Sequence, residues 1–360
     1  MKIVQIIPEL SLAGAQTMCE NLTYELIKMG HNVCVISLFT IESTIAKRLK
    51  NNGVNVYYLN KKRGLDFSVI IRMRKLLKSL RPDVIHTHLY VLQYVMPASW
   101  GLKVKRRVHT IHNIAKEENL PIARKINFVF YHLFKVIPVA LSRLIQNSVL
   151  EEYKLKICQV PIVFNGVPLD LCIKKNNYTR AGDIVRILHI GRYFEQKNHL
   201  DMIRAMKLVH DVFPNAVLEL YGDGPLMNNA KELIDELDAH AYIKQCGTVC
   251  SPFQILNDSD IFILPSKYEG MPMTLIEAMG TGLPIVASDV GGIPDMIDNY
   301  HNGILCAPKI DDIADKIIGL LNNEALCEKL GRSALTDSQK FSAELMAERY
   351  VSIYSNGSVL

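Results

Sequence analysis

Residues 260–282 read D-I-F-I-L-P-S-K-Y-E-G-M-P-M-T-L-I-E-A-M-G-T-G, and this stretch decides the fold. It predicts an apolar strand from Asp260 to Pro265, a turn at Gly270-Met271-Pro272, and a helix that begins at Met273. A strand that leads directly into a helix is typical of a parallel α/β sheet. The first amides of such a helix are unpaired and its dipole favours negative charge, so the turn is suited to bind a phosphate.

Two glutamates flank that turn, Glu269 before it and Glu277 in the helix. A carboxylate next to a phosphate is costly unless it binds something else, and sugar hydroxyls donate hydrogen bonds to carboxylates. The pattern therefore predicts a sugar joined to a phosphate, bound at one helix start. Glu277 taken alone is equally typical of a solvated helix residue, so the interpretation rests on the complete strand–turn–helix run.

A second phosphate-binding signal lies upstream, where the apolar run R-I-L-H-I at residues 186–190 leads into Gly191. Arg192 and Lys197 are five residues apart in the loop that follows, before a helix that begins near His199. Arginine offers phosphate oxygens a bidentate fork and lysine a point charge, which suits a pyrophosphate. Either cation alone is also compatible with an ordinary exposed position.

Three motifs occur together: G-R-Y-F-E-Q-K-N at residues 191–198, a G-D-G-P turn at 222–225 that we expect to be structural, and the run from Glu269 to the G-G-I-P ending at Pro294. Together they resemble glycosyltransferase family 4, of the bacterial surface-polysaccharide type. The likeness extends over the whole chain and is densest from Gly191 to Gly303. It implies the two-domain GT-B fold, a nucleotide diphosphate-sugar donor, retention of anomeric configuration, and no requirement for a metal ion or other cofactor.

The resemblance also implies roles for the residues quoted above. Arg192 and Lys197 would neutralise the leaving diphosphate in place of a metal ion, which is electrostatic stabilisation where charge develops. Glu269 would hold sugar hydroxyls and Glu277 the ribose. The other expected donor contacts are Gly191, Gly270, Met271, Pro272 and Met273. We expect three residues to select the sugar: Tyr193, Tyr268 and Met271.

The chain alternates apolar strand-like runs with amphipathic stretches of helical length, which predicts parallel sheets covered on both faces. The expected strands of the first half are Ile3–Pro8, Asn32–Leu38, Val54–Leu59, Val84–His88, Arg107–His112 and Ile137–Leu141. Those of the second half are Ile187–Ile190, Ala216–Tyr221, Ile243–Gly247, Ile261–Leu264, Pro284–Ser288 and Ile304–Cys306.

A length of 360 residues suggests two domains. The boundary signal is P-I-V-F-N-G-V-P at residues 161–168, followed by the polar stretch 174–183. We expect an acceptor-binding domain over residues 1–165 and a donor-binding domain over residues 166–340. The resemblance implies two doubly wound domains facing each other across a cleft. Residues 341–360 would return to the first domain as a C-terminal helix over 342–354.

The first domain offers further candidates in S-L-A-G-A-Q at residues 11–16 and T-I-H-N at 110–113. Gly14 permits a close backbone approach to the donor phosphate, although the family usually has a second glycine and an acidic residue here. The resemblance implies that His112 contacts the donor sugar. The H-T-H at residues 86–88 could suggest a metal, but no carboxylate accompanies it, so we expect no metal site.

Composition and charge narrow the possible partners. The eight cysteines have no zinc-ligand spacing, which favours buried reduced thiols in a cytoplasmic protein, and the N-terminal apolar run is too short for a signal peptide. Residues 1–165 carry 24 Lys and Arg against 10 Asp and Glu, whereas the rest of the chain is acidic. No nucleic-acid-binding motif accompanies the basic half. We therefore expect an anionic membrane surface or lipid phosphate as its partner, contacted through the basic, apolar stretches 61–81 and 124–135.

These features predict a retaining, metal-independent glycosyltransferase that is peripheral at the inner face of the cell membrane. It would move a sugar from a UDP-sugar, or a GDP-sugar as second choice, to a hydroxyl of a lipid-linked or polysaccharide acceptor in capsule or lipopolysaccharide synthesis. Two alternatives remain open: a GT-B-fold sugar-nucleotide epimerase, which needs no acceptor, and an inactive sugar-nucleotide-binding protein.

Overall fold

The computed structural model describes residues 1–64, 66–178 and 184–357, and the chain divides into two compact units. Unit 1 comprises Met1–Val167 and Ala343–Leu360, and unit 2 comprises Pro168–Ser342. The polar stretch expected as a linker, 174–183, falls partly outside the described residues, because 179–183 are not among them.

Unit 1 is built on a six-stranded parallel sheet with the strand order β3-β2-β1-β4-β5-β6. All five residues of β4 and most of β1 are buried, as expected for strands covered on both faces. The strands are β1 Lys2–Ile7, β2 Asn32–Ser37, β3 Asn55–Tyr58, β4 Val84–His88, β5 Arg106–Ile111 and β6 Ile137–Ala140. The α-helices are α1 Gly14–Lys28, α2 Thr44–Asn51, α3 Ser68–Leu80, α4 Leu92–Ser99, α5 Ala115–Glu118, α6 Pro121–Leu133 and α7 Arg143–Tyr153.

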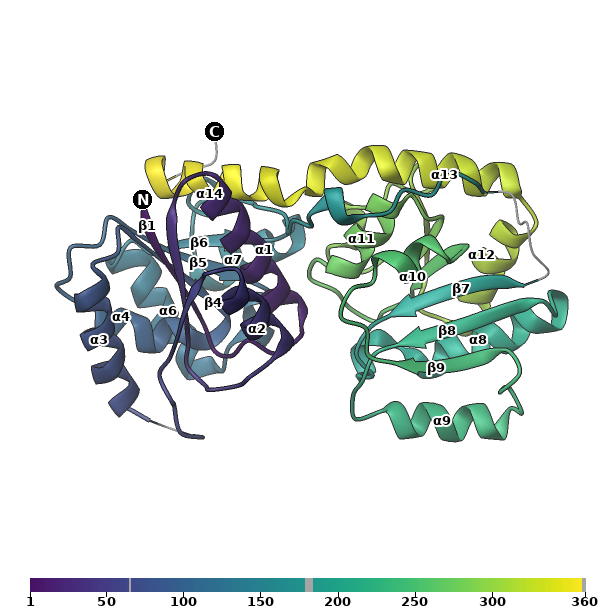
Figure 1. The fold of residues 1–360 in the computed structure, drawn as a ribbon, viewed down its shortest axis with the longest axis horizontal. Coiled ribbons are helices and arrows are strands. Elements are labelled where there is room, and N and C mark those ends of the chain that lie inside the picture. Colours follow the sequence, from purple (N-terminus) through teal and green to yellow (C-terminus); the bar gives the residue numbers. More distant parts are fainter. Residues whose placement is uncertain (65, 179–183, 358–360) are drawn as a thin grey trace. The chain divides into compact units, whose positions relative to one another are not determined.

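The last helix, α14 Ala343–Asn356, also belongs to unit 1, where it packs against α1 and β5 (Figure 1). Two tyrosines attach it to the sheet. Tyr354 Oη lies 2.7 Å from His86 Nδ1, and Tyr350 Oη lies 2.7 Å from Thr110 Oγ1. The end of the chain therefore completes the core of the unit that begins with the first strand.

Unit 2 repeats the architecture, with the strand order β12-β11-β10-β7-β8-β9. Its strands are β7 Val185–Ile190, β8 Ala216–Tyr221, β9 Ile243–Gly247, β10 Ile261–Leu264, β11 Ile285–Ser288 and β12 Ile304–Cys306. Its α-helices are α8 His199–Val212, α9 Met227–Glu236, α10 Phe253–Asn257, α11 Met273–Thr281, α12 Ile310–Leu321 and α13 Glu324–Asp337. Short 3-10 turns complete the two units: η1 Leu89–Val91, η2 Ile157–Gln159, η3 Leu169–Leu171, η4 Glu195–Lys197, η5 Ile293–Asp295 and η6 Ser338–Phe341.

The expected fold class, two doubly wound parallel sheets, is confirmed. In each sheet the strand order reverses once, between β1 and β4 in unit 1 and between β7 and β10 in unit 2. Loops that leave adjacent strands at such a reversal run to opposite faces of the sheet. They therefore leave a crevice at the carboxyl ends of the strands, where ligands bind in this architecture. Ligand-binding residues are therefore expected in the four loops that follow β1, β4, β7 and β10.

Two remaining expectations concern the chain as a whole. Among the described helices, none combines the length and the apolar character needed to cross a bilayer. The expectation of buried thiols holds for five cysteines and is wrong for Cys158, Cys246 and Cys250, which are exposed.

Candidate active site

Two loops of unit 2 begin next to each other at the strand-order reversal. β7 and β10 are hydrogen-bonded neighbours, so the loop after β7, with Arg192 and Lys197, starts beside the loop after β10, with Glu269. The two phosphate-binding signals of the sequence, about seventy residues apart, therefore meet at one edge of one sheet.

Lys197 and Glu269 form the centre of this arrangement. Lys197 Nζ lies 2.6 Å from Glu269 Oε1, and both side chains are largely buried. The Ser266 hydroxyl donates to the same oxygen at 2.7 Å, and Gln196 Nε2 lies 3.4 Å from Oε2. An ammonium has three donors and a carboxylate about four acceptor positions, so each partner keeps capacity for a ligand. The pair holds a cation and an acceptor in fixed positions side by side.

The helix that follows, α11, begins at Met273, as predicted. Its N-cap residue, Pro272, is extended and offers no capping side chain, so the first-turn amides are left for an anion. Glu277 lies one turn further into the helix and is 9 % exposed. Burial raises the pKa of its carboxyl to about 7, so near neutral pH it is available both as the acid and as the carboxylate.

Two glycines hold these loops against their neighbours. Gly291 has a φ of +63°, and a Cβ there would lie 1.8 Å from the Glu269 carbonyl oxygen. The next amide, that of Gly292, donates to the same carbonyl at 3.0 Å. Gly222, from the G-D-G-P turn, has a φ of +151°, and a Cβ there would lie 2.0 Å from the Gly191 carbonyl oxygen. The turns that contain Gly291 and Gly222 therefore pack closely against the backbone of the two site loops.

Arg192, expected to bind the diphosphate, and the three residues expected to select the sugar differ in exposure. Arg192, in the same loop as Lys197, is exposed, with its guanidinium 4.8 Å from the centroid of the Phe194 ring, and Tyr268 is 44 % exposed. Tyr193 is fully buried and stacks on the His199 ring at 4.0 Å, so its expected contact with a ligand is wrong. Met271 is also buried. A tyrosine next to a glycine turn gives no sequence signal of whether its ring faces the core or the ligand.

Unit 1 contributes the other two sequence candidates. α1 begins at Gly14, at the carboxyl end of β1, without a capping side chain from Ala13. His112 follows β5 and is half-buried. Its amide donates to Glu118 Oε1 at 2.8 Å, and its Nε2 lies 3.2 Å from His88 Nδ1.

Sequence reasoning missed two polar residues of unit 1. Burial raises the pKa of Glu118, which accepts from the His112 amide, to about 8. Gln5 lies in the middle of β1 and is fully buried. Its signal was present, because an amide within the apolar run K-I-V-Q-I-I must find hydrogen-bond partners in the core.

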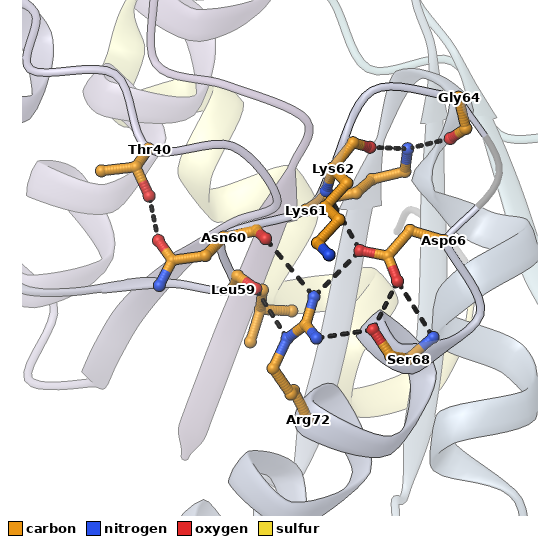
Figure 2. Close-up of polar contacts among 9 residues, drawn as sticks. All are labelled: Thr40, Leu59, Asn60, Lys61, Lys62, Gly64, Asp66, Ser68 and Arg72. Atoms are coloured by element: carbon orange, nitrogen blue, oxygen red, sulfur yellow. Dashed lines mark hydrogen bonds and ion pairs between the residues drawn. The ribbon is translucent and has the colours of Figure 1, made fainter.

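The basic stretch 61–81 was expected to contact an anionic membrane surface, but two of its cations bind groups within the protein, as Figure 2 shows. Lys61 is buried, and its ammonium donates to the carbonyls of Lys62 at 3.0 Å and Gly64 at 2.6 Å. Arg72 contacts Asp66 at 3.0 Å and the Leu59 carbonyl at 2.8 Å. Both cations therefore satisfy the loop before α3 and are not free for a lipid headgroup. Several hydrogen-bond donors lower the pKa of the Asp66 carboxyl well below its usual range, and the Ser68 hydroxyl has the largest effect.

Metal ligation finds no support in the part of the chain that the structure describes: no group of three or more His, Cys, Asp or Glu side chains there is arranged to hold an ion. Four histidines of unit 1, His86, His88, His109 and His112, contact one another, threonine hydroxyls or the Gln5 amide instead.

Two protein families match the chain, one in each half. Residues 12–171 match the family described as Glycosyltransferase Family 4, and residues 174–337 match Glycosyl transferases group 1. Together the two matches extend over all the unit 1 loops and unit 2 loops described above.

Individual proteins of known function or structure are similar over most of the chain. An Escherichia coli UDP-Gal:alpha-D-GlcNAc-diphosphoundecaprenol alpha-1,3-galactosyltransferase is 26% identical over 289 residues, 72% of each chain. A glycosyltransferase structure from Rickettsia africae matches 98% of both chains with a TM-score of 0.83 and 22% identity. The Anabaena HepE structure in complex with UDP and glucose matches 99% of this chain and 100% of its own, with a TM-score of 0.85 and 17% identity. At these identities the two structures show the fold.

Proposed function

The chain belongs to the family 4-like glycosyltransferases, with a group 1 domain in its second half, and from that premise we propose that it transfers a sugar from a UDP-sugar to a hydroxyl of a lipid-linked saccharide. Its two six-stranded sheets are those of the GT-B fold. The E. coli relative, whose name gives a UDP-sugar donor and a diphosphoundecaprenol-linked acceptor, supports this choice of substrates.

The observation that carries the proposal is the meeting of Lys197, Glu269 and the uncapped start of α11 at the strand-order reversal of unit 2. A sugar diphosphate presents an anion and several hydroxyls within a few ångströms of each other. The site offers a cation and a carboxylate 2.6 Å apart, and a helix N-terminus that follows the carboxylate in the same loop. Each part of the ligand therefore has a partner of matching chemistry.

In the proposed reaction, Lys197, Arg192 and the first amides of α11 stabilise the charge that develops on the departing UDP. The bond between the anomeric carbon and the diphosphate oxygen breaks, and the electron pair leaves with UDP. The acceptor oxygen bonds to the anomeric carbon, and its proton passes to the leaving phosphate. Glu269 binds sugar hydroxyls, Glu277 binds the ribose, and His112 accepts a hydrogen bond from the sugar. Attack on the face that the diphosphate leaves gives retention, as the family resemblance implies.

Two cations and a helix start supply the positive charge that a divalent ion supplies in other transferases. We therefore propose that the reaction needs no metal ion and no other cofactor.

An anionic lipid surface is the proposed partner of unit 1, through α3 and α6. Exposed apolar side chains follow one face of α6 at helical spacing: Ile122, Ile126, Val129 and Leu133. On α3 and just before it, Phe67 and Ile71 are more than two-thirds exposed. α4 contacts both helices, so α3 and α6 lie on the same side of the unit (Figure 1).

Exposed cations accompany these apolar side chains. Lys75 and Lys78 on α3 and Lys125 on α6 are exposed, whereas Lys61 and Arg72 are engaged internally. Trp100, 65 % exposed at the end of α4, lies edge-on to Phe134 at 5.1 Å between the centroids. Apolar side chains bordered by lysine and tryptophan suit the interface of an anionic bilayer. Such docking would place the enzyme where a lipid-linked acceptor lies.

The proposed function is tested by donor turnover with and without acceptor. A thermal-shift series with UDP-, GDP- and ADP-sugars identifies the donor, which should raise the melting temperature. We expect UDP release only when a lipid-diphosphate-linked saccharide is added. Conversion of the donor sugar without acceptor would indicate the epimerase instead. Tight donor binding with no turnover across many acceptors would indicate an inactive binding protein.

A further inference from the structure

A buried hydrogen-bond chain leads from the first strand to His112, and it starts with a fixed amide. Gln5 Nε2 lies 3.2 Å from the Cys19 carbonyl oxygen and 2.6 Å from Thr23 Oγ1. The Thr23 hydroxyl itself donates to the Cys19 carbonyl at 2.8 Å. A carbonyl only accepts, and the Thr23 proton is already used, so the atom of Gln5 that faces both must be the NH₂ group. The carboxamide oxygen of Gln5 therefore points the other way.

That oxygen faces His88. Gln5 Oε1 lies 3.0 Å from His88 Nε2, so His88 must carry a proton on Nε2 to donate to it. His88 is fully buried, and burial, together with the nearby imidazoles His86 and His112, lowers its pKa well below the usual value. The ring is therefore neutral, and its Nδ1 carries a lone pair.

The lone pair on His88 Nδ1 determines which nitrogen of His112 carries the proton. His88 Nδ1 lies 3.2 Å from His112 Nε2, so the proton between them belongs to His112. Burial of the imidazole lowers the pKa of His112 to about 3, so this ring is neutral too. Its Nδ1 is then unprotonated. Among the described residues this nitrogen has no hydrogen-bond partner, and His112 is only half-buried.

We propose that Gln5 and His88 are positioning residues that fix the tautomer of His112, so that its Nδ1 accepts a hydrogen bond from a hydroxyl of the sugar substrate. The opposite tautomer would place two lone pairs against each other between His112 and His88. Leaving a buried polar group unpaired in this way costs more than one hydrogen bond contributes. The proposal rests on the proposed function for the identity of the ligand, whereas the tautomer itself does not.

The tautomer can be observed without any assay of activity. Long-range ¹H–¹⁵N correlation spectra of the ¹⁵N-histidine-labelled protein distinguish a protonated from an unprotonated ring nitrogen. The His112 signals are identified by their loss in His112→Ala. In the unmodified protein we expect Nε2 of His112 to be protonated and Nδ1 bare. A protonated Nδ1 of His112 in that spectrum overturns the proposal.

The role of Gln5 is tested by Gln5→Met, which keeps a similar side-chain length and removes the acceptor. His88 is then free to protonate Nδ1, so we expect signals of the Nδ1-protonated tautomer of His112 to appear. We expect kcat to fall roughly tenfold, the rate equivalent of one hydrogen bond, with little change in UDP affinity. A folded Gln5→Met protein with the unmodified protein's tautomer and kcat would contradict the role of Gln5.

The matched control is Thr23→Val, in the same buried chain. It removes one partner of the Gln5 amide but leaves the Cys19 carbonyl, which by itself keeps the NH₂ group in place. We expect the His112 tautomer and kcat to be unchanged. A tautomer change in Thr23→Val would mean that general loosening of the core, and not the Gln5 acceptor, controls His112. If the tautomer is as expected but no sugar is transferred, the proposed function fails and the positioning chain stands.

Discussion

At the scale of single residues, Glu269 and Glu277 have the same chemistry in different surroundings. Glu269 is paired with Lys197 and accepts from Ser266, whereas Glu277 lies buried in a helix and has no ion-pair partner among the described residues. The first environment offers the carboxylate a cation and a hydroxyl donor, and the second raises the pKa of the Glu277 carboxyl. This difference supports the division of roles between sugar and ribose.

Replacement of each glutamate by glutamine should separate these roles. Glu269→Gln keeps the shape but weakens the hydrogen bonds accepted from sugar hydroxyls, so turnover should fall far more than affinity for free UDP. Glu277→Gln should mainly reduce nucleotide affinity, because a ribose contact serves the nucleotide. Steady-state kinetics and calorimetric titration with UDP measure the two effects, and two variants that behave alike would refute the division.

The raised pKa of Glu277 also predicts a pH dependence of stability. Its folded-state pKa of about 7 is above the ordinary value of 4.5, so protonation stabilises the folded chain. That stability is complete below about pH 4.5 and is lost as the pH rises through 7. Glu277→Gln removes this titration. The free energy of unfolding of the variant, relative to that of the unmodified protein, should therefore rise by on the order of 2–3 kcal/mol between pH 5 and pH 8. Denaturant unfolding at several pH values measures the difference, and a constant difference would contradict it.

At the scale of elements, the loops that carry the site residues are packed against two other turns of unit 2. The turn after β11 brings Gly291 against the backbone of Glu269, and the turn after β8 brings Gly222 against that of Gly191. The residues expected to bind donor are therefore positioned by segments that contribute no functional side chain themselves.

A single methyl group at Gly291 should therefore disturb catalysis. Gly291→Ala places a Cβ on the Glu269 carbonyl and forces a φ that side chains rarely adopt, so we expect a loss of stability of about 1–3 kcal/mol and a large fall in kcat. Gly319→Ala is the control, because it lies in α12 with open space around its Cβ position and should stabilise the protein by about 0.5–1 kcal/mol. Equal kcat in the two variants would show that the turn does not position Glu269.

The lipid-facing role of α3 is tested by charge reversal at its two exposed lysines. Each cation near an anionic bilayer contributes about 1 kcal/mol, so Lys75→Glu with Lys78→Glu should release the protein from phosphatidylserine vesicles at low salt. The exposed unit 2 pair Lys231→Glu and Lys329→Glu changes the net charge equally and should leave sedimentation unchanged. Added salt should weaken binding by the unmodified protein. Equal sedimentation with neutral and anionic vesicles would contradict the electrostatic part of the proposal.

At the scale of the whole molecule, the sequence predicted the sheets well and the side-chain partners poorly. Strands such as Val84–His88 and Ala216–Tyr221 begin and end as expected, because a buried parallel strand is a continuous apolar run with turn residues at its ends. Contacts such as Lys197 with Glu269 or Gln5 with His88 join residues more than seventy positions apart. No local pattern encodes them, since they depend on which strands become neighbours.

The same limit explains why the expected roles of Tyr193 and of two cations in the basic stretch were wrong. Tyr193 lies in a motif that resembles a ligand-binding loop, yet its ring stacks on His199 inside the core. Arg72 and Lys61 lie in a basic stretch, yet they satisfy Asp66 and loop carbonyls (Figure 2). The charge density of this stretch does not show which of its cations stay free, because the hydrogen-bond demand of the loop before α3 engages Lys61 and Arg72.

The central claim is that the residues at the start of α8 and α11 transfer a sugar from a nucleotide diphosphate donor. The most direct measurement is the transfer of labelled sugar from UDP-sugars to a lipid-diphosphate-linked saccharide in excess EDTA. It compares the unmodified protein with two variants, Arg192→Ala and Arg204→Ala. Arg204 is an arginine of α8 that pairs with Asp201.

We expect transfer by the unmodified protein and by Arg204→Ala. In Arg192→Ala we expect a loss of at least about 2 kcal/mol of transition-state stabilisation, roughly thirtyfold in rate, with no change in melting temperature because Arg192 is exposed. Transfer restored only by a divalent ion would contradict the metal independence, and no transfer from UDP-, GDP- or ADP-sugars by the folded protein would contradict the claim itself.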